Sequence, residues 1–345
     1  MTGDCSVIHA HLGRTGVRVS RLCLGVMNVG PSVGTDLSGT VMDRALDAGI
    51  TFFDTFLDTA NAHGRPTRAT GYTDAGAAEY AVGDWLSRSH GRRDQIVLAT
   101  GLHGPASPGP GRPAGDGKLS GPEIRRRCEE SLRRLRTDHI DLLQISSPAR
   151  DTPWEEIWQA TDMLAAQGKI VYVGSSGLAG WEIAAGNEAA MRRRSLGLVS
   201  NLCDYSVLER AAETEVLPVC QSYGVGVIGR SPLLDALLDG VSAYAPAGVP
   251  EQRQVELRQV ERRLERHRPR FEAFVALCES FGERPASVAL AWLLAQPELT
   301  AATIRPHGVD ELTAALRALE IVLGERELDT LDRIAPGPAV AVADR

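Results

Sequence analysis

Short apolar runs alternate with longer amphipathic segments along most of the chain. The runs lie at residues 22–26, 51–54, 96–100, 140–145, 170–175, 198–203, 225–229 and 301–304. Runs of this length are typical of buried strands, and the segments between them have helical periodicity, which predicts parallel strands joined by helices. Eight such units are the number that closes a (β/α)8 TIM barrel, an α/β fold.

The ends of several elements can also be predicted. Segments of mixed apolar and polar residues at 7–12 and 17–19 flank a turn at residues 14–16, which predicts an N-terminal β-hairpin. Two helices are expected to begin at capping boxes, Ser120-Gly-Pro-Glu123 and Thr152-Pro-Trp-Glu155. Each has proline in the first turn, where its missing N–H group costs nothing.

Three segments interrupt the alternation, at about 65–76, 101–121 and 234–262. The second is rich in glycine and proline, which is typical of a loop. Each segment lies wholly or partly after a strand, and loops in that place form the active-site mouth of barrel enzymes. We therefore predict a single domain over residues 1–345, with the barrel at about 20–335 and the three segments as substrate loops.

Charge and composition exclude several classes of partner. The net charge of −7 argues against nucleic acid, which binds concentrated positive charge. The first thirty residues lack a basic stretch followed by an apolar one, and no apolar run is long enough to cross a bilayer, so we expect a cytoplasmic protein with no membrane partner. The six cysteines have no metal-ligand spacing, which predicts reduced thiols and no metal site.

Several segments resemble the aldo-keto reductase family, over about residues 10–335. They include LGRTGVRVSRLCLGVMNVG after the hairpin, GITFFDT, SLRRLRTDHIDLLQI, GKIVYVGSS and PASVALAWLLAQPELTAATI. The resemblance implies the barrel with its N-terminal hairpin. It also implies reduction of aldehydes and ketones with NADPH by an aspartate, a tyrosine, a lysine and a histidine at the tops of the second, third and fourth strands. An acid is needed there because hydride arriving at a carbonyl carbon leaves negative charge on the oxygen.

Of these four groups the sequence keeps the aspartate, as Asp54 in FFDT. A second DT pair follows at Asp58, so two alignments of this segment with the family are possible. The tyrosine is absent, and in one register His63 takes its place. Gly101 stands at the lysine position and Ser146 at the histidine position.

The positions that grip the cofactor in the family also differ. Its serine-asparagine pair is Ser176-Gly177 here, its strand-six glutamine aligns with Leu202 beside Asn201, and its nicotinamide-stacking aromatic residue is Arg230. The stretch after the last strand, IRPHGVDELTAAL, lacks the family's Pro-Gly pair. Hydrogen bonds to charged groups contribute about 1.5 to 3 kcal/mol each. With several missing together, we expect that no cofactor is used.

The leading hypothesis is a small-molecule enzyme that performs non-redox acid/base chemistry, such as dehydration, isomerisation or cyclisation, with Asp54, His63 and Arg230 as catalytic groups. Imidazole titrates near neutral pH, and a guanidinium suits an anionic group on the substrate. Each residue also has a structural interpretation, as a strand-end buttress, an exposed loop histidine and a salt bridge, respectively. Further candidates for the substrate pocket are Asp58, Tyr72, His103, Ser146, Ser176 and Asn201.

Two alternatives remain open. One is an NAD(P)H-dependent oxidoreductase with a rewired active site, in which His63 or Tyr72 replaces the tyrosine and NADPH is the cofactor. The other is a non-catalytic scaffold or regulatory protein, whose role would survive loss of His63 and Asp54.

Overall fold

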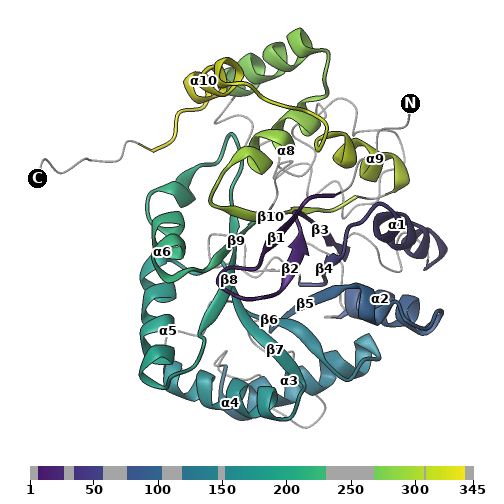
Figure 1. Ribbon diagram of the computed structural model, residues 1–345, viewed down its shortest axis with the longest axis vertical. Coiled ribbons are helices and arrows are strands. Elements are labelled where there is room, and N and C mark those ends of the chain that lie inside the picture. The colour runs from purple at the N-terminus through teal and green to yellow at the C-terminus, as the bar shows by residue number, and fades with distance from the viewer. Residues whose placement is uncertain are drawn as a thin grey trace, which may run out of the picture.

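The computed structural model describes residues 7–26, 35–56, 76–102, 119–146, 152–230, 268–306 and 308–338. Eight parallel strands form a closed barrel in the order β10-β3-β4-β5-β6-β7-β8-β9 (Figure 1). The strands are β3 (Leu22–Gly25), β4 (Phe52–Asp54), β5 (Val97–Leu102), β6 (Ile140–Ser146), β7 (Ile170–Ser176), β8 (Leu198–Asp204), β9 (Gly226–Arg230) and β10 (Leu299–Ile304). Each lies within two residues of its predicted range, and the predicted (β/α)8 fold is confirmed.

Helices surround the strands on the outside of the barrel (Figure 1). They are α1 (Thr35–Asp47), α2 (Ala77–Ser87), α3 (Gly121–Leu135), α4 (Trp154–Ala166), α5 (Gly180–Arg192), α6 (Val216–Tyr223), α8 (Pro285–Ala295), α9 (Val309–Arg317) and α10 (Glu325–Ile334). Residues 268–281 are also helical, and two short 3-10 helices lie at Arg93–Gln95 and Ala211–Glu213. Within the described ranges, no helix combines the length and the apolar character that crossing a membrane requires.

The N-terminal hairpin closes one end of the barrel. Its strands β1 (His9–His11) and β2 (Arg18–Ser20) pair antiparallel, and Figure 1 shows them crossing the ring of strands. Leu12 and Val19 pack onto the apolar side chains inside the barrel. The turn lies so close to the starts of β8 and β9 that a Cβ atom on Gly13 would stand 2.3 Å from the backbone oxygen of Val199 and 2.8 Å from the backbone nitrogen of Gly226. Because the hairpin covers the N-terminal ends of the strands, a site in the barrel opens at the C-terminal ends.

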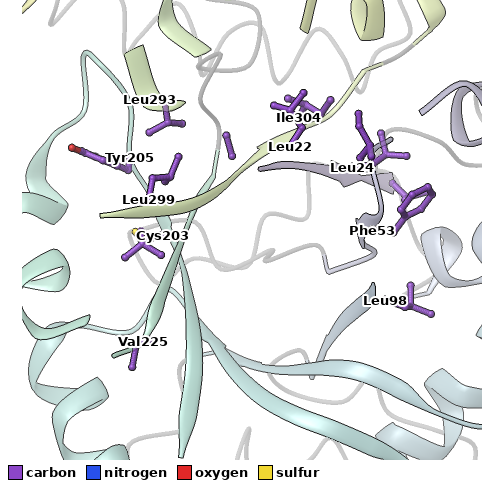
Figure 2. Close-up of a cluster of buried hydrophobic side chains, with 14 of the residues drawn as sticks. Leu22, Leu24, Phe53, Leu98, Cys203, Tyr205, Val225, Leu293, Leu299 and Ile304 are labelled. Atoms are coloured by element: carbon purple, nitrogen blue, oxygen red, sulfur yellow. The ribbon is translucent and has the colours of Figure 1, made fainter. Parts of the chain in front are cut away.

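Apolar side chains cover both faces of the sheet. Phe52 belongs to the cluster inside the barrel, whereas Phe53 and Leu98 belong to the cluster between the strands and the helices. Figure 2 shows Phe53 and Leu98 on the helix side of their strands. Successive side chains of a strand point to opposite faces. Asp54, two residues after Phe52, therefore points into the barrel.

The two predicted capping boxes do not form. Ser120 precedes α3 as expected, but its side chain makes no capping hydrogen bond. Glu123 instead pairs with Arg126, and this hydrogen bond holds the pKa of Glu123 at about 2. Helix α4 begins after Pro153, so Thr152 is not its N-cap. The sequence pattern marks where both helices begin, but tertiary partners decide how their first turns are satisfied.

The predicted substrate loops fall largely on residues 57–75, 103–118 and 231–267, which lie outside the described ranges. The second loop is shorter than predicted, because residues 101–102 continue β5 and residue 121 begins α3. The single-domain assignment for the whole chain stays a prediction.

Candidate active site at the mouth of the barrel

Polar side chains gather at the C-terminal ends of the strands, above an apolar interior. Each of these residues follows, by an even number of positions along the chain, a residue whose side chain lies inside the barrel. Gln144, for example, is two positions after Leu142, and Arg230 is two positions after Ile228. The strand period of two therefore directs them to the same opening. The set comprises Asp54, Gln144, Ser146, Ser176, Asp204, Arg230 and Arg305.

Asp54 is the most enclosed ionisable group of this mouth, with 0% of its surface exposed. Its Oδ1 atom accepts a hydrogen bond from the Phe56 N–H group at 2.8 Å, and Gln144 Nε2 lies 3.0 Å from both carboxyl oxygens. Burial raises the pKa of Asp54 from 3.8 to about 6, against the opposing effects of these hydrogen bonds and of the positive charge of Arg230. A carboxyl group with a pKa near 6 can hold and release a proton close to neutral pH.

The strand pairing also places Asp54 in register. Asp54 is paired with Gly25 on β3 and with Ala99 on β5, at the C-terminal end of its own strand. Of the two DT pairs, the first is thus the one that ends β4, while Asp58 lies outside the described residues.

An aromatic ring occupies the place where the family resemblance puts a lysine. That position is Gly101, and a Cβ atom built there would stand 2.0 Å from Phe56 Cδ2. The Phe56 ring is fully buried and rests against the bare backbone of β5. No side chain can enter from position 101 unless Phe56 moves. Among the described residues, the polar side chain that reaches Asp54 is instead the amide of Gln144.

Two serines line the same opening. Ser146 and Ser176 are paired across β6 and β7, and both are buried. Ser146 Oγ donates a hydrogen bond to the backbone oxygen of Leu102 at 3.2 Å. Both serines therefore stay candidates for the substrate pocket.

Asn201 does not lie in the mouth. Leu202 belongs to the cluster inside the barrel and Cys203 to the cluster behind the strands, so alternation directs Asn201 toward the helices. Its Oδ1 atom accepts a hydrogen bond from Ser175 Oγ at 2.8 Å. The prediction that Asn201 lines the pocket is therefore corrected. Adjacent residues of a strand point to opposite faces of the sheet, so the position of Asn201 beside Leu202 in the chain does not place its side chain inside the barrel.

Two arginines and a carboxylate occupy the opposite side of the mouth. Arg230 Nε donates to Asp204 Oδ1 at 2.8 Å, and the two residues are paired across β8 and β9. Burial and, to a smaller extent, the nearby positive charge of Arg230 lower the pKa of Arg305 to about 10, while Asp204 opposes the change. Gln144 and Arg305 were not predicted as site residues from the sequence. The even spacing of each from an interior apolar residue is the signal that could have found them.

The remaining predicted site residues are His63, Tyr72 and His103, and all three lie outside the described residues. The contact between His63 and Asp54 that the acid/base hypothesis requires stays a prediction.

The groups on the arginine side of the mouth fit a phosphate-bearing ligand. Helix α9 begins after Gly308 without a side-chain cap, and the N–H groups at a helix N-terminus bind phosphate. Arg305 precedes this helix, and Ser176 supplies a hydroxyl group at the end of β7. The acidic first turn of α9, with Asp310 and Glu311, opposes an anion. The hydroxyl, guanidinium and backbone N–H groups are of the kinds that bind a phosphate.

Comparison with known proteins identifies the family and several relatives named as oxidoreductases or reductases. The pattern of the aldo/keto reductase family matches residues 21–336. A Bacillus subtilis protein named "uncharacterized oxidoreductase YrpG" is 43% identical over 330 residues, which cover 96% of each chain. Norsolorinic acid reductase stcV of Emericella nidulans is 30% identical over 93% of this chain and 79% of its own length. A rice protein named "probable voltage-gated potassium channel subunit beta" is 25% identical over 91% of this chain and 92% of its own.

These matches correct the cofactor prediction. The family and its oxidoreductases generally use NAD(P)H, which contradicts the expectation that no cofactor is used. That expectation counted lost contacts at single positions. It did not count Arg305 as a donor, although the fold places this residue near Arg230 and Asp204 at the mouth.

Proposed function

This chain belongs to the aldo/keto reductase family, and on that premise we propose that it is an NAD(P)H-dependent oxidoreductase of small carbonyl or alcohol substrates with a rearranged proton-donating site. NAD(P)H, when bound, supplies or accepts the hydride. Ser176, Arg305 and the N-terminus of α9 are the described groups that would hold it.

The observation that carries this proposal is the carboxyl group of Asp54. Reduction of a carbonyl needs an acid whose pKa lies near the working pH, and burial raises the pKa of Asp54 to about 6. Hydrogen bonds from Gln144 and from the Phe56 N–H group fix its orientation. Because Asp54 is fully buried, a second group must pass its proton to the substrate, and we propose His63 for that step.

We further propose that the substrate carries an anionic group bound at Arg230. The ion pair with Asp204 fixes the orientation of the Arg230 guanidinium at the mouth. A guanidinium binds a carboxylate or phosphate with paired hydrogen bonds, which adds geometric specificity to the charge attraction.

A second candidate is acid/base chemistry on the same scaffold, such as dehydration, isomerisation or cyclisation. The feature that favours it is Phe56, which fills the space where the family resemblance implies an ammonium group. In that case Asp54 and His63 would transfer protons without net oxidation of NAD(P)H.

The test is turnover with NADPH and with NADH against paired aldehydes that differ in one carboxylate, followed by absorbance of the reduced nicotinamide and by product analysis. We expect cofactor oxidation matched by alcohol formation, a preference for the carboxylated aldehyde, and a loss of about 100-fold or more in Asp54→Asn. Asp94, which is exposed on a 3-10 helix, provides the control Asp94→Asn with unchanged rate. Conversion of substrate without cofactor oxidation would favour the second candidate. Absence of any conversion would support a non-catalytic scaffold.

A further inference from the structure

Gln144 reaches Asp54 across the strand that lies between them. Asp54 ends β4, Gln144 lies on β6, and β5 runs between these strands. On β5 the residue paired with Asp54 is Ala99 and the residue paired with Gln144 is Gly101, so only small residues of this strand lie between them. The amide of Gln144 reaches across β5 and places Nε2 at 3.0 Å from both oxygens of Asp54.

The other half of the same amide is unsatisfied. Gln144 is fully buried, and its Oε1 atom accepts no hydrogen bond from the part of the chain that the structure describes. A buried acceptor without a donor is unfavourable, and native proteins seldom leave one without a reason. Nε2 is thus fully engaged with a carboxylate while the adjacent oxygen lacks a donor.

A protonated Asp54 supplies that donor. A carboxylate only accepts hydrogen bonds, whereas a protonated carboxyl has one O–H donor and keeps an accepting oxygen. A carboxylic acid and a primary amide can therefore share two hydrogen bonds, O–H to the amide oxygen and N–H to the carboxyl oxygen. The terminal torsion of a glutamine side chain is broad, so the amide of Gln144 can turn between the two arrangements.

We propose that Gln144 is a positioning residue that holds Asp54 in both protonation states, with Nε2 donating to the carboxylate and Oε1 accepting from the protonated carboxyl. The proton binds one oxygen of Asp54 and donates to Oε1, while Nε2 donates to the other oxygen. The carboxyl group stays in one place as its charge changes, which is what a reversible proton donor requires. The inference rests on the proposed function only for the use made of that proton.

Few other charged groups face Asp54 within the described residues. Arg230 on β9 attracts the carboxylate, and the thiol of Cys23 on β3 is buried beside it, with a pKa far above its ordinary value because of burial and of Asp54 itself. The facing residues of β5, Ala99 and Gly101, carry no ionisable group. Among these neighbours, Gln144 is the side chain that hydrogen-bonds to Asp54.

Infrared difference spectroscopy between acidic and neutral pH tests the proposal on the protein without cofactor or substrate. The carboxyl band that disappears in Asp54→Asn belongs to Asp54. In Gln144→Leu we expect this band to move to higher frequency, because the protonated carboxyl loses its acceptor. Gln95→Leu, a change at an exposed glutamine, should leave the band in place. An Asp54 band at the same frequency in wild type and Gln144→Leu would overturn the proposal.

A second measurement needs no substitution at Gln144. In wild-type protein with isotope-labelled glutamine, the amide band of one glutamine should shift as Asp54 titrates, and this shift should be absent in Asp54→Asn. A glutamine spectrum that does not respond to the titration would refute the exchange of hydrogen bonds. Because neither measurement involves turnover, failure of the oxidoreductase assay and failure of this proposal are separate results.

Discussion

Replacing Asp54 with asparagine should stabilise the protein, and the gain should grow with pH. The carboxyl group is fully buried, and burial raises its pKa from 3.8 to about 6. A raised carboxyl pKa means that the folded protein holds a proton which the unfolded chain releases. The stability contributed by that proton is complete below pH 3.8 and is lost as the pH rises through about 6. Asparagine has nearly the same shape and no charge, so it avoids this loss.

The size of the effect follows from the two pKa values. Each pH unit between them corresponds to about 1.4 kcal/mol. The carboxylate therefore lowers the free energy of unfolding of the wild type by about 3 kcal/mol at pH 8 and by about 1.5 kcal/mol at pH 5. Asparagine can accept the hydrogen bond from Phe56, and the amide of Gln144 can turn to accept one from it. We therefore expect Asp54→Asn to keep most of this difference as added stability.

Urea unfolding of wild type and Asp54→Asn at pH 5 and pH 8 measures this directly. The difference between the two proteins should be larger at pH 8 by about 1.5 kcal/mol. Asp94→Asn, an exposed substitution, should show little change with pH. If Asp54→Asn were less stable than wild type at pH 8, or if the difference did not depend on pH, the inference of a protonatable buried carboxyl would be refuted.

Two further substitutions test the packing around the site. Gly101→Ala should lower the free energy of unfolding by about 1–3 kcal/mol, because its Cβ atom would stand 2.0 Å from the Phe56 ring. In the double variant with Phe56→Ala, urea unfolding should show a smaller loss than the sum of the two single losses. Strictly additive losses would contradict the contact. Glu79→Gln should lower the free energy of unfolding by about 3 kcal/mol, measured by differential scanning calorimetry or urea unfolding. The substitution removes the negative charge of a buried carboxylate that pairs with Arg134 at 2.5 Å and accepts a hydrogen bond from Thr100 at 2.7 Å. A loss under about 1 kcal/mol would show that this buried network contributes little.

Much of the barrel could be predicted from sequence because its strands are buried on both faces. Such strands appear as short apolar runs, and the order of the runs follows the order of the strands around the barrel. Asp54 and Arg230 could be predicted as site residues for the same reason, because each stands at the end of a strand that the apolar pattern predicts. The position of a strand end is enough to place a side chain at the mouth.

Other parts of the site depend on contacts that a sequence does not display. Gln144 lies inside an apolar run, and its partner Asp54 is on β4, two strands away around the barrel. The Phe56 ring, two residues after the end of β4, takes the space beside Gly101 on β5. Asn201 was misplaced because it lies beside a pocket residue in the chain but on the other face of the sheet. Contacts with other segments of the chain decided the first two cases, and the alternation of side chains along the strand decided the third.

The most direct test of the account is the rate of hydride transfer in a single turnover. Wild type and Asp54→Asn would be mixed with NADPH and a carboxylated aldehyde between pH 5 and pH 8, and oxidation of the nicotinamide followed in time. The account predicts a wild-type rate that falls as the pH rises through about 6, and a variant about 100-fold slower whose rate does not share this pH dependence. A variant as fast as wild type, with the same pH profile, would contradict the assignment of Asp54 as the source of the proton.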